Sequence, residues 1–235
     1  MNEYQLLENE MDAIKNSTTA DFSQRIEVIE EVLVTLRIIA KLPEKIEQEK
    51  FLRGRKFANI WGLSRRTFNL SIASYHALLY GFYNANQALE RSIFENFITA
   101  YSLWINDVAF NEEWICFMAS ESFDKKAWKK FNPLSLMENM SIFPDKATIK
   151  SNYYHGLSKY THSTLQSANI DLTYSKISAD SGLEALLAWN FGHLVLLTKS
   201  GKEYFTKFPN LNKRINEIGD KILNVLNNKL PFTKF

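Results

Sequence analysis

Residues 83–106 read YNANQALERSIFENFITAYSLWIN, and this stretch decides the fold class of the chain. Large apolar side chains at helical spacing cover most directions around it, and the polar pair Asn106-Asp107 ends it. Apolar residues that recur with a period near 3.6 indicate a helix, and a helix that is apolar almost all round is buried. The stretch therefore predicts a long buried helix surrounded by other helices.

The composition agrees with a helical protein. Of 235 residues, 46% are hydrophobic and 14% aromatic, which is enough to build a core, whereas only 8 are Gly and 5 are Pro. Sheet proteins need many turns, and turns need these two residue types. We expect an all-α protein in which residues 1–235 form a single compact multi-helix bundle, with residues 1–20 as a loosely packed N-terminal segment.

The apolar periodicity and the cap signals also predict where individual helices begin and end. Pro43, Gly62 and Ser64 are expected to separate early helices, and residues 163–180 to form a loop. The predicted helices cover residues 3–16, 22–41 with Asp21 as N-cap, 44–60, 65–80, 83–106, 111–131 as one or two helices, 134–140, 145–161, 182–200 and 210–229.

Charge and cysteine content indicate the compartment. The net charge of +2 is too small to favour nucleic acid on bulk electrostatics. The single Cys116 excludes an intramolecular disulfide, fits a reducing compartment and is expected to be packed. The N-terminus lacks signal-peptide features, and the most apolar run, residues 185–198, is shorter than a membrane span. We expect a cytoplasmic protein without membrane contact.

Arg91 and Glu95 place two opposite charges one turn apart inside the apolar helix. A buried charge is costly unless it is paired, so this pair needs a reason to be there. Under one interpretation the two residues form a structural ion pair. Under the other, Arg91 binds an anionic group, such as a phosphate or carboxylate, and Glu95 orients it.

A second polar segment covers residues 153–163 and reads YYHGLSKYTHS. His155, Ser158 and His162 are spaced to share one helix face, with Tyr154 close by, and an imidazole near a helix end can act as a proton donor or anion ligand. A capping or core role is the alternative. Since no carboxylate lies at ligand spacing from these histidines, we expect no metal, and nothing predicts a cofactor.

The remaining polar features have simpler expectations. His76 and His193 lie on apolar helices and are expected to be core or lining residues. A lysine-rich stretch, residues 125–130 around Trp128, is expected to be a solvated face, with nucleic-acid binding as the alternative. The sequence motifs of kinases, P-loop hydrolases, dinucleotide oxidoreductases, zincins and α/β-hydrolases are absent from the sequence.

The two polar segments resemble a widespread family of uncharacterised all-helical bacterial proteins, grouped as a domain of unknown function. Its members carry an Arg-x-x-x-Glu helix and a downstream Tyr-x-x-Leu-Ser-x-x-x-His segment. The matching residues are Arg91, Glu95, Tyr154, Leu157, Ser158 and His162. Over residues 60–200 the resemblance implies an all-α fold and a bacterial origin, and it implies no particular chemistry.

A more distant resemblance is to the HEPN group of helical nucleases and nucleic-acid-binding domains from toxin and phage-defence systems. Their signature places a His four to six residues after an Arg, and this chain has no such spacing. A metal-independent ribonuclease of this kind would need Arg91 and His162 to meet through the fold, with His162 as acid–base and Arg91 stabilising phosphate.

The leading hypothesis is a non-enzymatic binding or interaction module that self-associates, most simply as a homodimer, through an apolar helix face. Its polar pocket would hold a small anionic ligand. The residues assigned to the pocket are Arg91, Glu95, Tyr154, Ser158 and His162. The HEPN-like ribonuclease and a structural partner-binding protein without a pocket are the alternatives.

Overall fold

The computed structural model describes residues 3–41, 55–157 and 174–232. Within these ranges the regular structure is entirely helical and contains no strand, which confirms the all-α prediction. The elements are α1 (Glu3–Ala40), α3 (Arg55–Leu79), α4 (Tyr83–Ile105), α5 (Val108–Ala119), α6 (Lys125–Phe131), α7 (Pro133–Glu138), α8 (Lys146–Ile149), the π-helix η2 (Lys150–Gly156), α11 (Lys176–Ser200), α12 (Lys202–Phe205) and α13 (Pro209–Val225).

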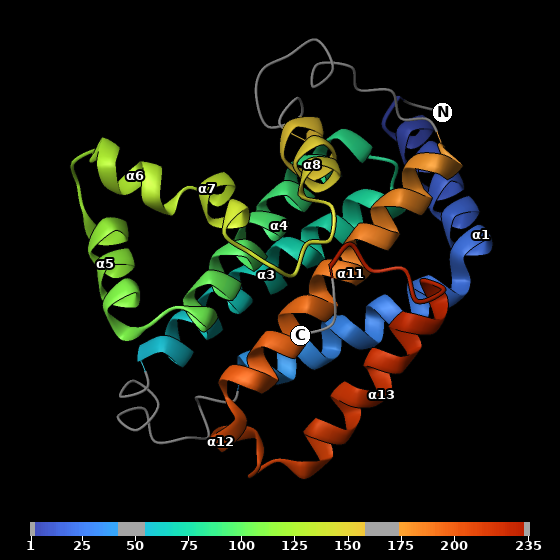
Figure 1. Ribbon diagram of the computed structural model, residues 1–235. Coiled ribbons are helices and arrows are strands. Elements are labelled where there is room, and N and C mark those ends of the chain that lie inside the picture. The colour runs from blue at the N-terminus through green and yellow to red at the C-terminus, as the bar shows by residue number, and fades with distance from the viewer. Residues whose placement is uncertain (1–2, 42–54, 158–173, 233–235) are drawn as a thin grey trace.

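Three long helices, α3, α4 and α11, pack against one another and form the centre of the bundle (Figure 1). Helices α1 and α13 contact each other and cover α11 on one side, while α8 and η2 lie against α4. Helices α5, α6 and α7 form an arm on the side of the bundle away from the first part of α1 (Figure 1). The bundle thus has a packed body and one lateral arm.

The core is centred on Trp189 of α11, which is fully buried. Its ring lies 4.9 Å from that of Phe94 and 5.4 Å from that of Phe97, measured between centroids, so α4 packs directly on α11. Tyr153 of η2 contacts the same indole at 4.9 Å, and Phe232 near the C-terminus contacts it at 5.7 Å. Four segments distant in sequence are therefore joined through one aromatic cluster.

Two glycines, Gly182 of α11 and Gly201 at the C-cap of this helix, allow α3 to approach the backbone of α11. A Cβ atom at Gly182 would overlap the side chain of Leu78, and one at Gly201 would overlap the ring of Phe57. Leu78 and Phe57 both belong to α3 and both are buried. Each glycine is therefore a notch in α11 that receives one side chain of α3.

The predicted break at Gly62 and Ser64 is wrong, because α3 runs through both residues. Gly62 is exposed and has open space around its Cβ position, so it costs the helix only about 1 kcal/mol relative to Ala. The hydroxyl of Ser64 donates a 2.9 Å hydrogen bond to the carbonyl of Ile60 inside the helix. Of the helix predicted over 44–60, residues 44–54 lie outside the described residues.

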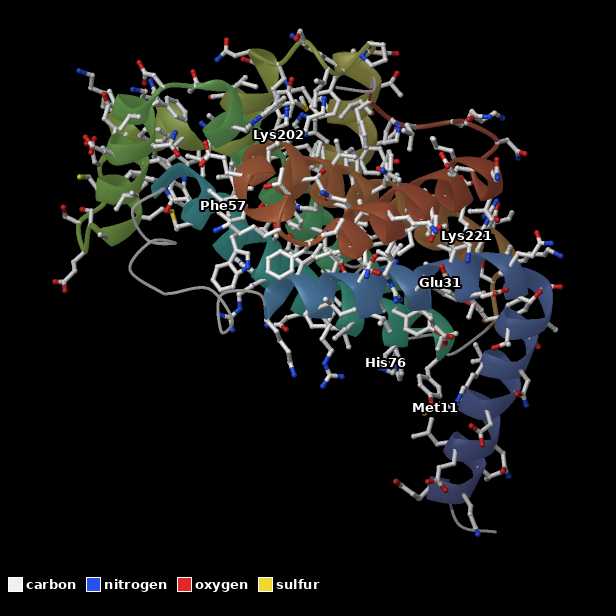
Figure 2. All side chains as sticks on the ribbon, turned by 90° about the horizontal axis from the view of Figure 1, so that it is seen from below. Met11, Glu31, Phe57, His76, Lys202 and Lys221 are labelled. Carbon is white, nitrogen blue, oxygen red and sulfur yellow. The ribbon has the colours of Figure 1, made fainter. Side chains whose placement is uncertain are left out.

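The predicted separation of 3–16 from 22–41 takes a different form in the structure. Helix α1 consists of two helices joined across a kink at Phe22, whose φ of −129° and ψ of 29° are not helical, so the predicted start of a helix beside Asp21 is present while the first helix continues past residue 16 to this kink. The carboxylate of Asp21, directly before the kink, accepts a hydrogen bond from the hydroxyl of Tyr174 and pairs with Lys176 at 3.3 Å. The part of α1 before the kink extends beyond the rest of the molecule (Figure 2).

Two later boundaries also differ from the prediction. Helix α11 begins at Lys176, six residues before the predicted start, because the hydroxyl of Ser175 accepts the backbone N–H of Ser178 at 3.3 Å as an N-cap. The helix predicted over 145–161 does begin after the cap residue Asp145. It then changes to a π-helix at Lys150, and residues from 158 onward lie outside the described part.

Candidate functional site

The structure brings Arg91, Glu95 and Tyr154 together where α4 meets η2. Arg91 Nε donates to Glu95 Oε1 at 2.8 Å, and Arg91 Nη1 donates to the backbone carbonyl of Tyr154 at 3.1 Å. The guanidinium also lies over the ring of Tyr154, 4.2 Å from its centroid. These contacts join η2 to α4, because one side chain holds a carboxylate of α4 and both the backbone and the ring of η2.

The other two residues assigned to this pocket, Ser158 and His162, lie outside the described residues. His155 is described and is exposed, with its ring 5.4 Å from that of Tyr154 in an edge-on arrangement. The meeting of Arg91 with His162, on which the ribonuclease hypothesis depends, therefore stays a prediction.

Glu95 also faces a cleft that the sequence did not predict. This cleft has a volume of about 200 Å³ and lies between the α3–α4 pair and the arm. Four aromatic side chains of the arm and five polar side chains of α3 and α4 line it, and the wall is completed by Leu63, Met118, Asn132 and Pro133. The aromatic residues are Trp114, Phe117, Trp128 and Phe131, and the polar residues of α3 and α4 are Arg66, Ser92, Glu95, Asn96 and Thr99.

The outer wall of the cleft is held in place by Phe131 and by helix caps. The ring of Phe131 is buried and lies 5.2 Å from that of Phe110 and 5.5 Å from that of Phe117, so it fixes α6 against α5. The side chain of Asp124 accepts two backbone N–H groups at the start of α6, and that of Asn132 accepts one at the start of α7. These contacts hold the arm in one position, so it forms a fixed wall of the cleft.

Arg66 and Trp128 are two exposed residues of the cleft lining, and their guanidinium and indole groups can both contact a ligand. Trp128 is 47% exposed although it lines the cleft, so part of its side chain is open to solvent. Arg66 is also exposed, and among the described residues no carboxylate forms an ion pair with it. Glu95, by contrast, already has Arg91 as its counter-charge.

Behind the cleft, a ladder of buried polar side chains joins α3 to α4 and α11. The hydroxyls of α3 occur at successive turns on one face and are all buried. The ladder consists of Ser64, Thr67, Ser71 and Ser74 of α3, Asn86, Glu90 and Asn96 of α4, and Asn190 and His193 of α11.

The two ends of the ladder have different partners. His193 Nε2 lies 3.1 Å from Thr67 Oγ1, which also accepts a 3.2 Å hydrogen bond from the amide of Asn96. At the other end, Ser74 donates to the amide oxygen of Asn86 at 2.5 Å, and the amide nitrogen of Asn86 donates to Glu90 Oε1. Since Asn96 also lines the cleft, the ladder reaches the cleft wall at one point.

Burial shifts both titratable groups of the ladder toward their neutral forms. It raises the pKa of Glu90 to about 8, against the opposing effect of the hydrogen bond from Asn86. Burial also lowers the pKa of His193 to about 3, although a backbone hydrogen bond at Ile93 acts in the opposite direction. At neutral pH the ladder therefore consists mainly of neutral groups that exchange ordinary hydrogen bonds.

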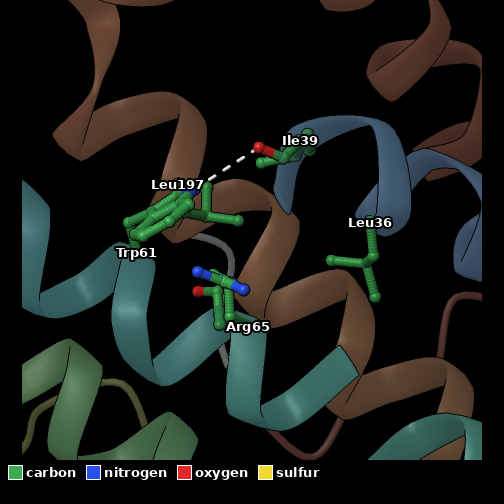
Figure 3. A pocket seen from close by; sticks show the side chains of 6 residues that line it. Leu36, Ile39, Trp61, Arg65 and Leu197 are labelled. Atoms are coloured by element: carbon green, nitrogen blue, oxygen red, sulfur yellow. Dashed lines mark hydrogen bonds between the residues drawn. The ribbon is translucent and has the colours of Figure 1, made fainter. Parts of the chain in front are cut away.

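A second hollow, between α1, α3 and α11, is not a ligand site. It is lined by Leu36, Ile39, Trp61, Ser64, Arg65 and Leu197 and leaves no room for a water molecule (Figure 3). The indole N–H of Trp61 donates to the carbonyl of Ile39 at 3.4 Å, and the guanidinium of Arg65 lies 4.9 Å from the indole centroid. These contacts fill the crevice from within.

The other expectations for single residues have mixed outcomes. His193 is buried and hydrogen-bonded, as predicted for a core residue, whereas His76 is exposed. Cys116 is exposed, so the prediction that it is packed is wrong. Among the described residues, no three His, Cys, Asp or Glu side chains are grouped to hold a metal ion. No helix in the same ranges is both long and apolar enough to cross a membrane.

Comparison with known proteins leaves the family open. No protein-family model, no curated protein and no solved structure matches this chain. The resemblance of the two polar segments to a domain of unknown function, and the more distant resemblance to HEPN domains, therefore stay predictions.

Proposed function

We propose that this protein is a binding module whose cleft between α3–α4 and the arm holds a small ligand that carries a ring and an anionic group. One observation carries the proposal: an aromatic-lined cleft has an exposed arginine, Arg66, for which no described carboxylate is an ion-pair partner. Convergence of aromatic walls with a few polar groups is typical of small-molecule sites.

The size of the cleft limits the ligand. Its volume of about 200 Å³ is below the roughly 300–1,000 Å³ of pockets that enclose drug-sized molecules. A single ring system with a short charged substituent fits this space better than an extended molecule. The half-exposed indole of Trp128 offers such a ring a face for stacking.

The charges of the cleft orient the ligand. Because Glu95 is paired with Arg91, its carboxylate accepts hydrogen bonds but repels an anion. Arg66 offers five N–H donors and a charge that no described carboxylate neutralises, so the anionic group is expected there. In this proposal Arg91 is a positioning residue, since it binds Glu95 and does not line the cleft, and Tyr154 acts through Arg91, which it contacts with its backbone carbonyl and its ring.

A matched pair of probes tests the proposal. The fluorescent dye naphthalene-1-sulfonate carries one ring system and an anionic group, and naphthalene-1-sulfonamide, which is uncharged at neutral pH, carries the same ring system without the charge. We expect Arg66→Ala to weaken binding of the sulfonate dye about tenfold, as for the loss of one exposed charge-assisted hydrogen bond, and to leave the uncharged dye unaffected. Trp128→Ala should weaken both. Dissociation constants from fluorescence titration are the measurement.

Lys213→Ala provides the matched control, because Lys213 is an exposed cation on α13, which forms no part of the cleft lining. Near-ultraviolet circular dichroism of each variant ensures that a folded protein is being titrated. Equal affinities of the wild type and both cleft variants for the two dyes would show that the dyes bind elsewhere and would overturn the proposal.

A further inference from the structure

The first part of α1 carries an apolar stripe that this chain leaves largely uncovered. Tyr4, Leu7, Met11 and Ile14 recur at intervals of three and four residues and so lie on one helix face. Only Ile14 is buried, against Gly81, while Tyr4 is 69% and Leu7 is 39% exposed. Figure 2 shows the turn that carries Met11 extending away from the rest of the bundle.

Acidic side chains flank this stripe. Glu8 and Glu10 lie on either side of it and Asp12 follows, and all three are exposed. The one basic residue in the same turns, Lys15, is held over the ring of Tyr80 at 5.4 Å from the centroid. A partner for the stripe should therefore be apolar and basic.

Such a surface exists on α6. Phe123, just before the helix, is 74% exposed. Lys125, Lys126 and Lys129 are exposed and lie on the face of α6 opposite the buried Phe131. No carboxylate among the described residues forms an ion pair with these three lysines, whereas Lys130 pairs with Glu113. The surface formed by Phe123 and the three lysines is called the α6 face below.

One chain cannot bring the two surfaces together. The first part of α1 and the α6 face lie at opposite ends of the bundle in both Figure 1 and Figure 2. A second copy of the chain, however, can place its α6 face on the α1 stripe of the first. The two surfaces match in charge sign as well as in apolar character.

We propose that this protein self-associates by docking the α1 stripe of one copy, Tyr4, Leu7 and Met11, on the α6 face of another. Because two different surfaces meet, the contact is heterologous. Two copies arranged antiparallel can form it twice and close as a dimer, and otherwise the contact repeats along a chain of molecules. Paired exposed charges make the association weaker at high salt.

A charge swap tests which surfaces meet. Glu8→Lys/Glu10→Lys makes the α1 stripe basic, and Lys125→Glu/Lys129→Glu makes the α6 face acidic. The wild type should associate in low salt. Each variant alone should be monomeric, with a dissociation constant raised about tenfold or more, because like charges then face each other across the contact. An equimolar mixture of the two variants should associate again, since each contact between unlike copies pairs opposite charges.

Light scattering coupled to size-exclusion chromatography measures the mass of each sample at several concentrations and two salt levels. The control Lys213→Glu/Glu217→Lys reverses an exposed ion pair on α13 and should associate like the wild type. A monomeric wild type would overturn the proposal. If the α1 variant lost association while the α6 variant kept it, α1 would pair with α1 and the proposal would be wrong. A mixture of the two variants that stays monomeric would also overturn it.

Discussion

Glu90→Gln is expected to stabilise the protein strongly above pH 8 and to change its stability little at pH 5. Glu90 is buried in the polar ladder, where burial raises the pKa of its carboxyl to about 8 from an ordinary value of 4.5. The folded protein therefore keeps this group protonated at pH values where the unfolded chain has released the proton. Glutamine has the shape of the protonated acid and never ionises.

The sign of the effect follows from proton binding. Between pH 4.5 and 8 the folded state binds one more proton than the unfolded state, so the free energy of unfolding falls as pH rises through this range. One pKa unit corresponds to about 1.36 kcal/mol, which makes the full loss on the order of 5 kcal/mol above pH 8. The Gln variant should be free of this loss.

Chemical unfolding at pH 5, 7 and 9 measures the effect. Between pH 7 and 9 the unfolding free energy should fall for the wild type and stay nearly constant for Glu90→Gln, whereas between pH 5 and 6.5 only the variant should gain stability. Glu95→Gln is the control, because Glu95 is a half-buried acid of the same helix that is paired with Arg91. Parallel curves for the wild type and the Glu90→Gln variant between pH 5 and 9 would refute the prediction that Glu90 is a buried, protonated carboxyl in the folded protein.

His193 should produce the opposite dependence on the acid side. Burial lowers the pKa of its imidazole to about 3 from an ordinary value of 6.5. Below pH 6.5 the unfolded chain gains a proton that the folded protein does not, so stability falls as pH decreases toward 3. The loss is again on the order of 5 kcal/mol at the acid limit.

His193→Gln tests this prediction, because the amide can still reach Thr67, which lies 3.1 Å from the imidazole. At pH 7 the variant should lose about 1–3 kcal/mol through imperfect hydrogen bonding in the core. Its stability should then rise as pH falls from 6.5 to 4.5, because His193 no longer opposes the contribution of Glu90, whereas the stability of the wild type should stay nearly constant there and fall below pH 4.5. His76→Gln, at an exposed histidine, is the matched control. A steeper acid loss in His193→Gln than in the wild type would contradict the prediction.

Together the two groups predict a plateau of stability. Between pH 4.5 and 6.5 the contribution of Glu90 falls with rising pH while that of His193 rises, and the two slopes nearly cancel. Stability should therefore be highest in this interval and fall on both sides of it.

The sequence predicted the fold class and the buried helices well because these depend on local periodicity. The helix predicted over 83–106 extends over 83–105, and both helices with strong apolar stripes near the C-terminus are present. Breaks inferred from single residues were less reliable, as at Gly62 and Ser64, because the penalty of one such residue is small beside the burial of a long helix face.

The candidate site was only partly predictable. The i,i+4 spacing of Arg91 and Glu95 predicted their contact, since that contact lies within one helix. The cleft beside them depends on where the arm folds back, and local sequence does not determine such a long-range contact. Lys125, Lys126 and Lys129 were recognised as a basic stretch, but nothing in their spacing shows the distance to α1.

The hydroxyl residues of the polar ladder have helical spacing in the sequence, but the same sequence also predicts a helix break at Ser64. Ser64, Thr67, Ser71 and Ser74 recur at intervals of three, four and three residues, which is the spacing of a buried helix face. Because serine is common at helix ends, Ser64 was interpreted as a break. The partners of these hydroxyls come from two other helices, so their hydrogen bonds could not be inferred before the packing was known.

The notches at Gly182 and Gly201 determine the axial alignment of α3 along α11, which the polar ladder does not determine. The hydroxyls of α3 repeat every turn, so α3 could slide by one turn along α11 and several of them would still face polar groups. Leu78 and Phe57 could not follow, because they occupy Gly182 and Gly201, and the neighbouring turns of α11 carry larger side chains. The two glycines therefore allow one axial alignment of α3 and α11 and exclude alignments that are shifted by one helical turn.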